Sequence, residues 1–464
     1  MNHIPLSRRL LAGVGAVALI AATAPAATSA SGGAAPAADS RGASDQAHDK
    51  IVTARIDADR IMGHIETLTV DIGPRVASSP EEDAAASYIA DELESLGYDV
   101  EVQEFPYVNT VGYLHVGGPD GTALLVRAGG GSALTDGDGI TAPVVDAGFG
   151  SPADFPAATA GAIALVQRGG NTFADIVGNA AEAGAVGVAI QNDDWRIFSA
   201  TVADSPIPFV TMNDEQGELL RAAADDGATL RMNRYQTSQN VIATKAPTLP
   251  GRGARDEVVI FSAHYDSVPA SPGASDNASG VAVMLELARI NAQLPTATEI
   301  RFAAVGAEEV GLRGSRHYAQ NLPAAERDRI IANFNMDMVG TASPEQNTLF
   351  MNTLNGTGVD DPADNLVSRA GRQAAERLGY GDIVRSPYHR GASDHQAFHE
   401  IGVPAVNFIW RDPVTAALEP TYHQPLDTID RVSPDRLRTA AEIIAAASYR
   451  VIRHRVPGRP ADGG

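Results

Sequence analysis

The sequence predicts an α/β protein whose mostly parallel or mixed central sheet is flanked by helices and interrupted by a small β-rich domain. From residue 240 onward, apolar runs of strand length alternate with helical stretches, an arrangement typical of a parallel sheet covered on both faces. Between about residues 114 and 239 the chain is dense in Gly, Ala and Asp, with short apolar runs separated by turns, which indicates an inserted domain. The 464 residues suffice for two or three domains with buried cores.

The individual elements are predicted from periodicity, beginning near residue 51. Four aliphatic residues at helical spacing predict a helix over 56–68, and a second helix over 80–96 ends at Gly97. Residues 99–105 alternate like a half-buried strand. Further strands are predicted over 258–262, 299–305, 331–336 and 405–410, and further helices over 278–293 and 362–378.

The N-terminal segment is predicted to lie outside the fold. The basic pair Arg8 and Arg9 precedes an apolar run over 10–24 and then small residues, which is typical of an export signal of either the Sec or the twin-arginine type. The run is short for a stable membrane anchor, and residues 31–50 have almost nothing to bury, which predicts a disordered leader or propeptide. The expected domains are a signal peptide over 1–30, this leader, a main domain over 51–115 and 240–456, an insertion over 116–239, and a tail over 457–464.

The composition excludes several classes of protein. Asp and Glu outnumber Lys and Arg by 57 to 35, and a net charge of −22 disfavours nucleic acid as a partner. The chain contains no cysteine, so disulfides and thiolate metal sites are excluded. Any metal must therefore be held by His, Asp and Glu.

Five polar motifs carry the candidate chemistry, and three of them follow predicted strands, where open α/β sheets bind ligands. Taken singly, each motif has a simpler interpretation, such as a helix-capping Asp, paired acids in a solvated turn, or a His–Asp hydrogen bond. Together they offer two His and three carboxylates, a set of N and O donors suited to zinc. The motifs are His264-Tyr265-Asp266, Asp276-Asn277-Ala278-Ser279-Gly280, Glu308-Glu309, Asp337, and Tyr422-His423-Gln424-Pro425-Leu426-Asp427-Thr428.

In order and in local sequence, these motifs resemble those of the M28 family of zinc aminopeptidases, over roughly residues 51–453. The motifs His-Tyr-Asp-Ser, Ser-Asp-Asn-Ala-Ser-Gly, Glu-Glu, Asn-Met-Asp-Met and Tyr-His-x-Pro-x-Asp-Thr are highly specific in combination. Residues 142–220 resemble the protease-associated domain, a small module inserted in exported peptidases, although Ile176 stands where that family commonly has Lys. The resemblance implies a fold like that of zinc exopeptidases with this domain inserted.

The resemblance implies a pair of zinc ions per chain, with Asp276 bridging them. The other expected ligands are His264 and Asp337 at one ion, and Glu309 and His423 at the second. Zinc ions about 3.5–4 Å apart can share a water and make it a nucleophilic hydroxide near neutral pH.

Other residues receive supporting roles by the same resemblance. Glu308 is expected to be the general base, and Tyr422 to donate a hydrogen bond to the oxyanion. Asp266 can accept the ring N–H of His264 and so fix its tautomer, and Asp394 resembles a further acid that supports the ligands. Arg390 is a candidate substrate contact, whereas the nearby His395 and His399 are interpreted as structural.

The predicted function is that of a secreted, monomeric aminopeptidase acting on peptides, with a family-based preference for large apolar first residues. The same chemistry serves a carboxypeptidase or an amide deacylase. A catalytically silent binding protein on a peptidase fold is the alternative from another class, although no ligand position departs from the family pattern.

Overall fold

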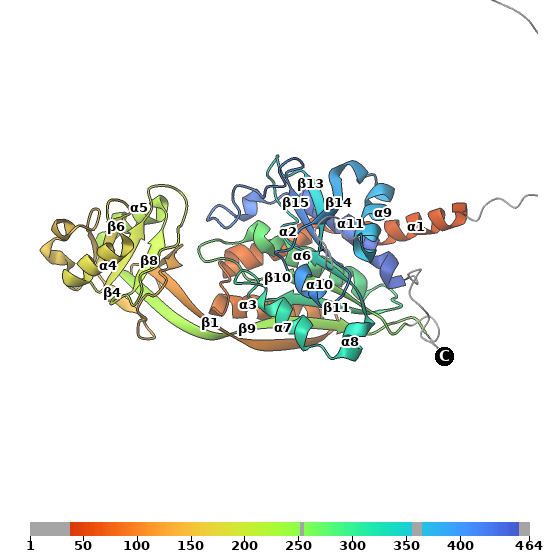
Figure 1. The fold of residues 1–464 in the computed structure, drawn as a ribbon, viewed down its shortest axis with the longest axis horizontal. Helices are drawn as coiled ribbons and strands as arrows, with labels where there is room; N and C mark the ends of the chain where they lie inside the picture. The colour runs from red at the N-terminus through yellow and green to blue at the C-terminus, as the bar shows by residue number, and fades with distance from the viewer. Residues whose placement is uncertain (1–37, 251–254, 355–363, 454–464) are drawn as a thin grey trace, which may run out of the picture. The chain divides into compact units, whose positions relative to one another are not determined.

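The computed structural model describes residues 38–250, 255–354 and 364–453, and its largest element is a ten-stranded mixed sheet (Figure 1). The strands are ordered β14-β13-β15-β12-β10-β11-β9-β1-β2, and β4 pairs with β9 beside this path. The predicted signal peptide and the tail lie outside the described residues. The strands are β1 (Asp99–Val116), β2 (Thr122–Leu124), β4 (Ile140–Ala142), β9 (Ala228–Lys245), β10 (Val258–His264), β11 (Glu299–Val305), β12 (Ile330–Met336), β13 (Thr348–Thr353), β14 (Val384–His389) and β15 (Ala405–Arg411).

The centre of this sheet is parallel, and its flanks are mixed. Strands β11, β10, β12 and β15 run parallel to one another, whereas β9 pairs antiparallel with β11 and β13 pairs antiparallel with β15. The predicted α/β class is therefore confirmed, and each of the four apolar runs predicted as strands lies in one of these central strands. Their parallel order brings the carboxyl ends of β10, β11 and β12 to one edge of the sheet.

Helices cover both faces of the central strands, as the continuous apolar runs predict. On β10, Val259 and Phe261 face the larger core, and the alternate residues Val258 and Ile260 face a smaller one. The larger core is closed by α2 (Ala58–Glu66), α3 (Pro80–Ser95), α6 (Ser279–Ala292), α9 (Leu366–Leu378) and α11 (Pro434–Arg453), and the smaller one by α7 (Arg313–Asn321) and α10 (His395–Glu400). A short helix, α8 (Ala324–Arg329), precedes β12.

The segment before α2 differs from the prediction. Residues 31–50 were expected to be disordered, but α1 (Ala38–Thr53) is helical in its described part. Its last turns are held by the buried Val52 and by an ion pair in which Asp49 meets Arg377 of α9 at 2.6 Å. Sequence composition could not indicate this pairing because the partner lies 328 positions away. Among the described residues, no helix has the length and apolar character needed to cross a membrane.

The inserted segment folds around a second, five-stranded sheet of its own. The order is β3-β8-β7-β6-β5, and the helices α4 (Phe173–Glu182) and α5 (Asp214–Ala222) accompany it. The segment leaves and re-enters the main sheet through β1 and β9, which pair from Asp99↔Thr244 to Val116↔Ala228. The predicted boundary after residue 239 falls within β9, which continues unbroken to Lys245. The strands are β3 (Arg127–Ala128), β5 (Val144–Asp146), β6 (Ile163–Gln167), β7 (Gly187–Gln191) and β8 (Phe209–Met212).

Candidate metal centre

The five predicted ligand residues come together at the carboxyl edge of the central strands. His264 is the last residue of β10, and Asp337 directly follows β12. Glu309 lies in the turn after β11, and β11 and β10 end side by side because His264 is paired with Val305. Asp276 lies in the turn η6 (Ala274–Ala278), where its backbone departs from helical geometry, and His423 lies in the loop between β15 and α11.

Their donor atoms form two groups that share one residue, Asp276. In the first group, His264 Nε2 lies 3.3 Å from Asp276 Oδ1 and 3.6 Å from Asp337 Oδ1. In the second, His423 Nε2 lies 3.2 Å from Asp276 Oδ2 and 2.9 Å from Glu309 Oε2. Asp276 therefore presents a different carboxylate oxygen to each group, as a bridging ligand does.

Both groups fit zinc by spacing and by chemistry. Ligands at about 2.0–2.1 Å around a tetrahedral zinc ion lie roughly 3.3 Å from one another, close to the separations found here. Two carboxylate oxygens of these groups are buried and accept no hydrogen bond from any described residue: Oδ1 of Asp337 and Oε1 of Glu309. Buried carboxylates without donors are costly unless a cation pairs with them. The donor set therefore suits a pair of divalent cations.

The neighbouring carboxylates raise the pKa values of both histidines. Burial lowers the pKa of His423, but Asp276 and Glu309 outweigh burial and raise it to about 10. Burial likewise lowers the pKa of His264, and Glu308 together with the carboxylates around it raises that pKa well above its ordinary value. Without metal, protons on both rings therefore balance part of the negative charge.

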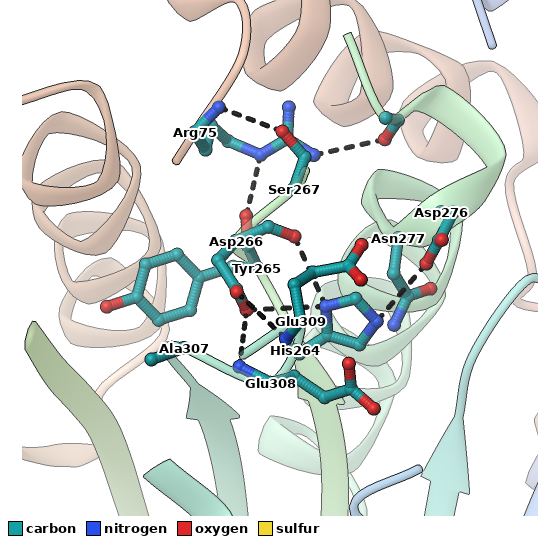
Figure 2. A network of polar contacts seen from close by, with 12 residues as sticks. Arg75, His264, Tyr265, Asp266, Ser267, Asp276, Asn277, Ala307, Glu308 and Glu309 are labelled. Atoms are coloured by element: carbon teal, nitrogen blue, oxygen red, sulfur yellow. Dashed lines mark hydrogen bonds and ion pairs between the residues drawn. The ribbon is translucent and has the colours of Figure 1, made fainter. Parts of the chain in front are cut away.

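Asp266 connects two of the ligand loops (Figure 2). Its Oδ1 accepts a hydrogen bond from the backbone N–H of Glu308 at 3.0 Å, and Oδ2 accepts one from that of Glu309 at 3.2 Å. Nδ1 of His264 lies 3.2 Å from the backbone carbonyl of Asp266, with which it shares a hydrogen bond, and 3.4 Å from Oδ1. Asp266 thus fixes the turn that carries both glutamates and contacts the His264 ring, and the control of the ring's tautomer by its carboxylate stays a prediction.

Two further side chains tie the ligand loops together, and no role was predicted for either of them. Asn277 Oδ1 accepts from the backbone N–H of Met338 at 3.2 Å, and its Nδ2 donates to the carbonyl of Met336 at 2.9 Å, so it holds both neighbours of Asp337. Asp427 accepts from the backbone N–H of Ser275 at 2.7 Å and from that of Asp276 at 3.0 Å. Both residues stand inside motifs noted in the sequence, but their bonds reach positions that the sequence does not place.

The backbone is strained beside several ligands. Ala307, Met338 and His423 have φ values of +52°, +59° and +60°, in a region that residues other than Gly seldom adopt. Ala307 precedes the two glutamates and Met338 follows Asp337. Clusters of such residues are typical of functional sites, where the surrounding structure holds them in place.

Glu308 and Tyr422 each adjoin a predicted ligand in the sequence, and both have raised pKa values. Burial raises the pKa of Glu308 well above its ordinary value, and the nearby His264 acts against this shift. Burial also raises the pKa of Tyr422, so its hydroxyl stays protonated and can donate a hydrogen bond. The Tyr422 ring stacks on that of His423, with ring centroids 3.7 Å apart.

The remaining predicted residues differ in their relation to the site. Asp394 is fully buried, burial raises its pKa to about 7, and it interacts electrostatically with His264. Arg390 follows β14 with an exposed side chain that makes no described contact with the ligands. Its carbonyl accepts a hydrogen bond from Nε2 of His395 at 2.9 Å, and burial lowers the pKa of that histidine to about 4. His395 is therefore neutral at neutral pH, and its structural role stays a prediction.

An α/β sheet with two carboxylate–imidazole groups at its carboxyl edge defines a metal-dependent hydrolase. The chain belongs to peptidase family M28, whose family model matches residues 240–448, and the PA domain model matches residues 140–220. It is 41% identical over 396 residues to the aminopeptidase YwaD of Bacillus subtilis (strain 168), covering 84% of each chain. The predicted family and inserted domain are thus confirmed.

Solved structures agree with this assignment. The structure of BSAP, a zinc aminopeptidase from Bacillus subtilis, is 40% identical with a TM-score of 0.60, over 86% of this chain and 95% of that one. An aminopeptidase from Aneurinibacillus sp. strain AM-1 is 37% identical with a TM-score of 0.57, over 89% and 98% of the two chains. The similarity therefore extends over the inserted domain as well as the main one.

Proposed function

We propose that this chain is exported and hydrolyses the N-terminal peptide bond of peptides with the help of two zinc ions. That the chain is a zinc-dependent aminopeptidase follows from its family and from relatives similar over most of its length. The observation that carries the two-zinc proposal is the placing of the two Asp276 oxygens in separate ligand groups. Export is supported by the basic, apolar and small residues over 8–30.

Each of the two ligand groups would hold one zinc ion. His264 and Asp337 would hold one ion, Glu309 and His423 the other, and Asp276 both. Bound zinc would supply Lewis-acid chemistry by lowering the pKa of a water from near 16 to about 7 and by polarising the scissile carbonyl. Three carboxylates offset most of the four positive charges.

The protein's own groups move the protons. Glu308 takes a proton from the attacking water and returns it to the leaving amine, a task that suits an acid whose pKa burial has raised. The protonated hydroxyl of Tyr422 donates to the oxygen on which negative charge develops. One donor of this kind is worth about 3 kcal/mol of barrier.

We also propose that the preferred first residues are large and apolar. Tyr422 packs against a buried apolar cluster formed by Met338, Phe350, Ile409 and Ala416. Met338 directly follows the ligand Asp337, so the cluster begins beside the metal centre. The cluster itself is buried, so the apolar surface that it supports for a first residue is the ring of the half-buried Tyr422, on which an apolar side chain would bury surface.

The proposal is tested with the Glu308→Gln variant and a pair of substrates. Leu-p-nitroanilide should be hydrolysed and its N-acetylated form left intact, because the acetyl group removes the free amine. Glu308→Gln should lower kcat by roughly 10²–10⁴-fold, the usual contribution of a general base, while still binding two zinc ions by elemental analysis. Equal hydrolysis of both substrates would refute aminopeptidase action, and near-normal kcat in the variant would remove Glu308 from its role.

A further inference from the structure

Arg75 is a fully buried cation whose guanidinium makes all of its described hydrogen bonds to backbone carbonyls. It lies in the turn between η1 (Thr67–Ile72) and α3, and none of its surface is exposed. Three of its hydrogen bonds cross to the loop after β10. Nε donates to the carbonyl of Tyr265 at 2.6 Å (Figure 2). Nη1 donates to the carbonyl of Pro272 at 2.7 Å, and Nη2 to that of Gly273 at 3.0 Å. Nη1 also donates to the carbonyls of Leu68 and Gly73, at 2.9 and 3.1 Å.

The backbone of Arg75 adds two bonds to the same loop. Its N–H donates to Oγ of Ser267 at 3.0 Å, and its carbonyl accepts from the N–H of Ser267 at 3.0 Å. The loop over 265–273 is therefore held at its beginning, by Tyr265 and Ser267, and at its end, by Pro272 and Gly273. His264 and Asp276 stand directly before and shortly after this loop.

The absence of a direct carboxylate partner is unusual for a buried arginine. Among the described residues, no carboxylate lies within ion-pair distance of Arg75. Burial lowers its pKa to about 10, against the influence of Asp266, Asp427, Asp276 and Glu309, so the guanidinium stays charged at neutral pH. The anions that compensate it are thus the carboxylates of the metal centre and those that support them.

We propose that Arg75 is a positioning residue that sets the zinc affinity of both ligand groups by fixing the loop between His264 and Asp276. The inference rests on the proposed two-zinc function. Asp276 belongs to both groups, so displacement of this loop would weaken both sites. The guanidinium has five donors in a planar fork and makes five bonds to carbonyls here, whereas the ammonium of lysine has only three donors.

The test measures zinc binding in Arg75→Lys and Arg75→Met, with Lys245→Met as the matched control. Lys245 also donates from a cation to three carbonyls, those of Asn291, Ala292 and Leu294, but these lie at the far end of α6 from the metal centre. The metal-free proteins are titrated with zinc against a chromophoric chelator, and folding is followed by circular dichroism. Both Arg75 variants should bind zinc roughly 10–100-fold more weakly, the range for residues that orient metal ligands, whereas Lys245→Met should lower thermal stability and leave zinc affinity unchanged.

The outcomes separate this inference from the function on which it rests. If the Arg75 variants fold and bind zinc as tightly as the wild type, the inference is overturned. The proposed function still stands in that case, provided that the wild-type chain binds two zinc ions. A wild-type chain that binds fewer than two zinc ions overturns the function and the inference together. If neither Arg75 variant folds, Ser267→Ala tests the fixing of the loop, because it removes the hydrogen bond that the backbone N–H of Arg75 donates to Oγ of Ser267: weaker zinc binding supports the inference and unchanged affinity overturns it.

Discussion

Replacement of Asn277 by Ala should weaken the metal centre without touching a ligand. The side chain is fully buried and makes three hydrogen bonds: Oδ1 accepts from the N–H of Gly280 at 2.9 Å and of Met338 at 3.2 Å, and Nδ2 donates to the carbonyl of Met336 at 2.9 Å. The substitution removes all three bonds. Two of them hold the residues on either side of Asp337.

The size of the effect follows from the groups left without partners. Each buried group costs about 1–3 kcal/mol when it loses its partner, so three groups cost roughly 3–9 kcal/mol in a rigid framework. Water can enter the vacated space and bond some of these groups, which places the expected loss near the lower limit, about 3 kcal/mol. Because the backbone on both sides of Asp337 loses its bonds to Asn277, the site that contains Asp337 should also bind zinc roughly 10–100-fold more weakly.

The control is Asn365→Ala, because Asn365 makes the same set of bonds elsewhere. Its Oδ1 accepts from Val367 and Ser368 at 2.9 and 3.1 Å, and its Nδ2 donates to the carbonyl of Ala405 at 2.9 Å, at the opposite end of β15 from the metal edge. Urea unfolding of the metal-free proteins should show a loss of stability in both variants. Zinc titration should distinguish them, and equal zinc affinity in Asn277→Ala, Asn365→Ala and wild type would refute the reasoning.

Two further predictions concern catalysis and protons. Tyr422→Phe should lower kcat by roughly 10²–10³-fold through the loss of one oxyanion donor, with two zinc ions retained; an unchanged kcat would exclude that role. The raised pKa values of His264 and His423 stabilise the metal-free protein below pH 6.5, and this contribution is lost as the pH rises, for His423 through about 10. Zinc must displace these protons, so its affinity should increase over that interval, and calorimetry in buffers of different ionisation enthalpy should detect proton release. An affinity independent of pH would contradict the assignment of the two imidazoles.

The central strands were predictable from sequence because burial on both faces produces continuous apolar runs. Residues 299–305 are β11 as predicted, and the run over 331–336 lies within β12. Neither β13 nor β14 was predicted. Strand β14 lies at the edge of the sheet, its residues are half-buried or exposed, and it contains Pro387, so neither an apolar run nor an alternation marks it.

The ligands were predictable for a related reason. Residues such as His264 and Asp337 interrupt the chain where buried strands end, and a polar residue at that place is conspicuous. The residues that hold the loops leave no such local signal. Arg75 bonds a carbonyl 190 positions away, and Asp427 bonds backbone groups about 150 positions away. Such pairings are set by the tertiary fold, and periodicity along one chain does not encode them.

The supporting side chains also explain why the two ligand groups act as one unit. Asp266 joins the loop after β10 to the turn after β11, Asn277 joins η6 to the end of β12, and Asp427 joins the His423 loop to η6. The backbone of Asp276 is thus held from two sides, while its two oxygens serve different groups. A change at either Asn277 or Asp427 must therefore be felt at both groups, whereas a change at a ligand such as Asp337 removes a donor from one group alone. The two groups are thus coupled by Asp276, which belongs to both, and by the residues that hold its backbone without binding metal.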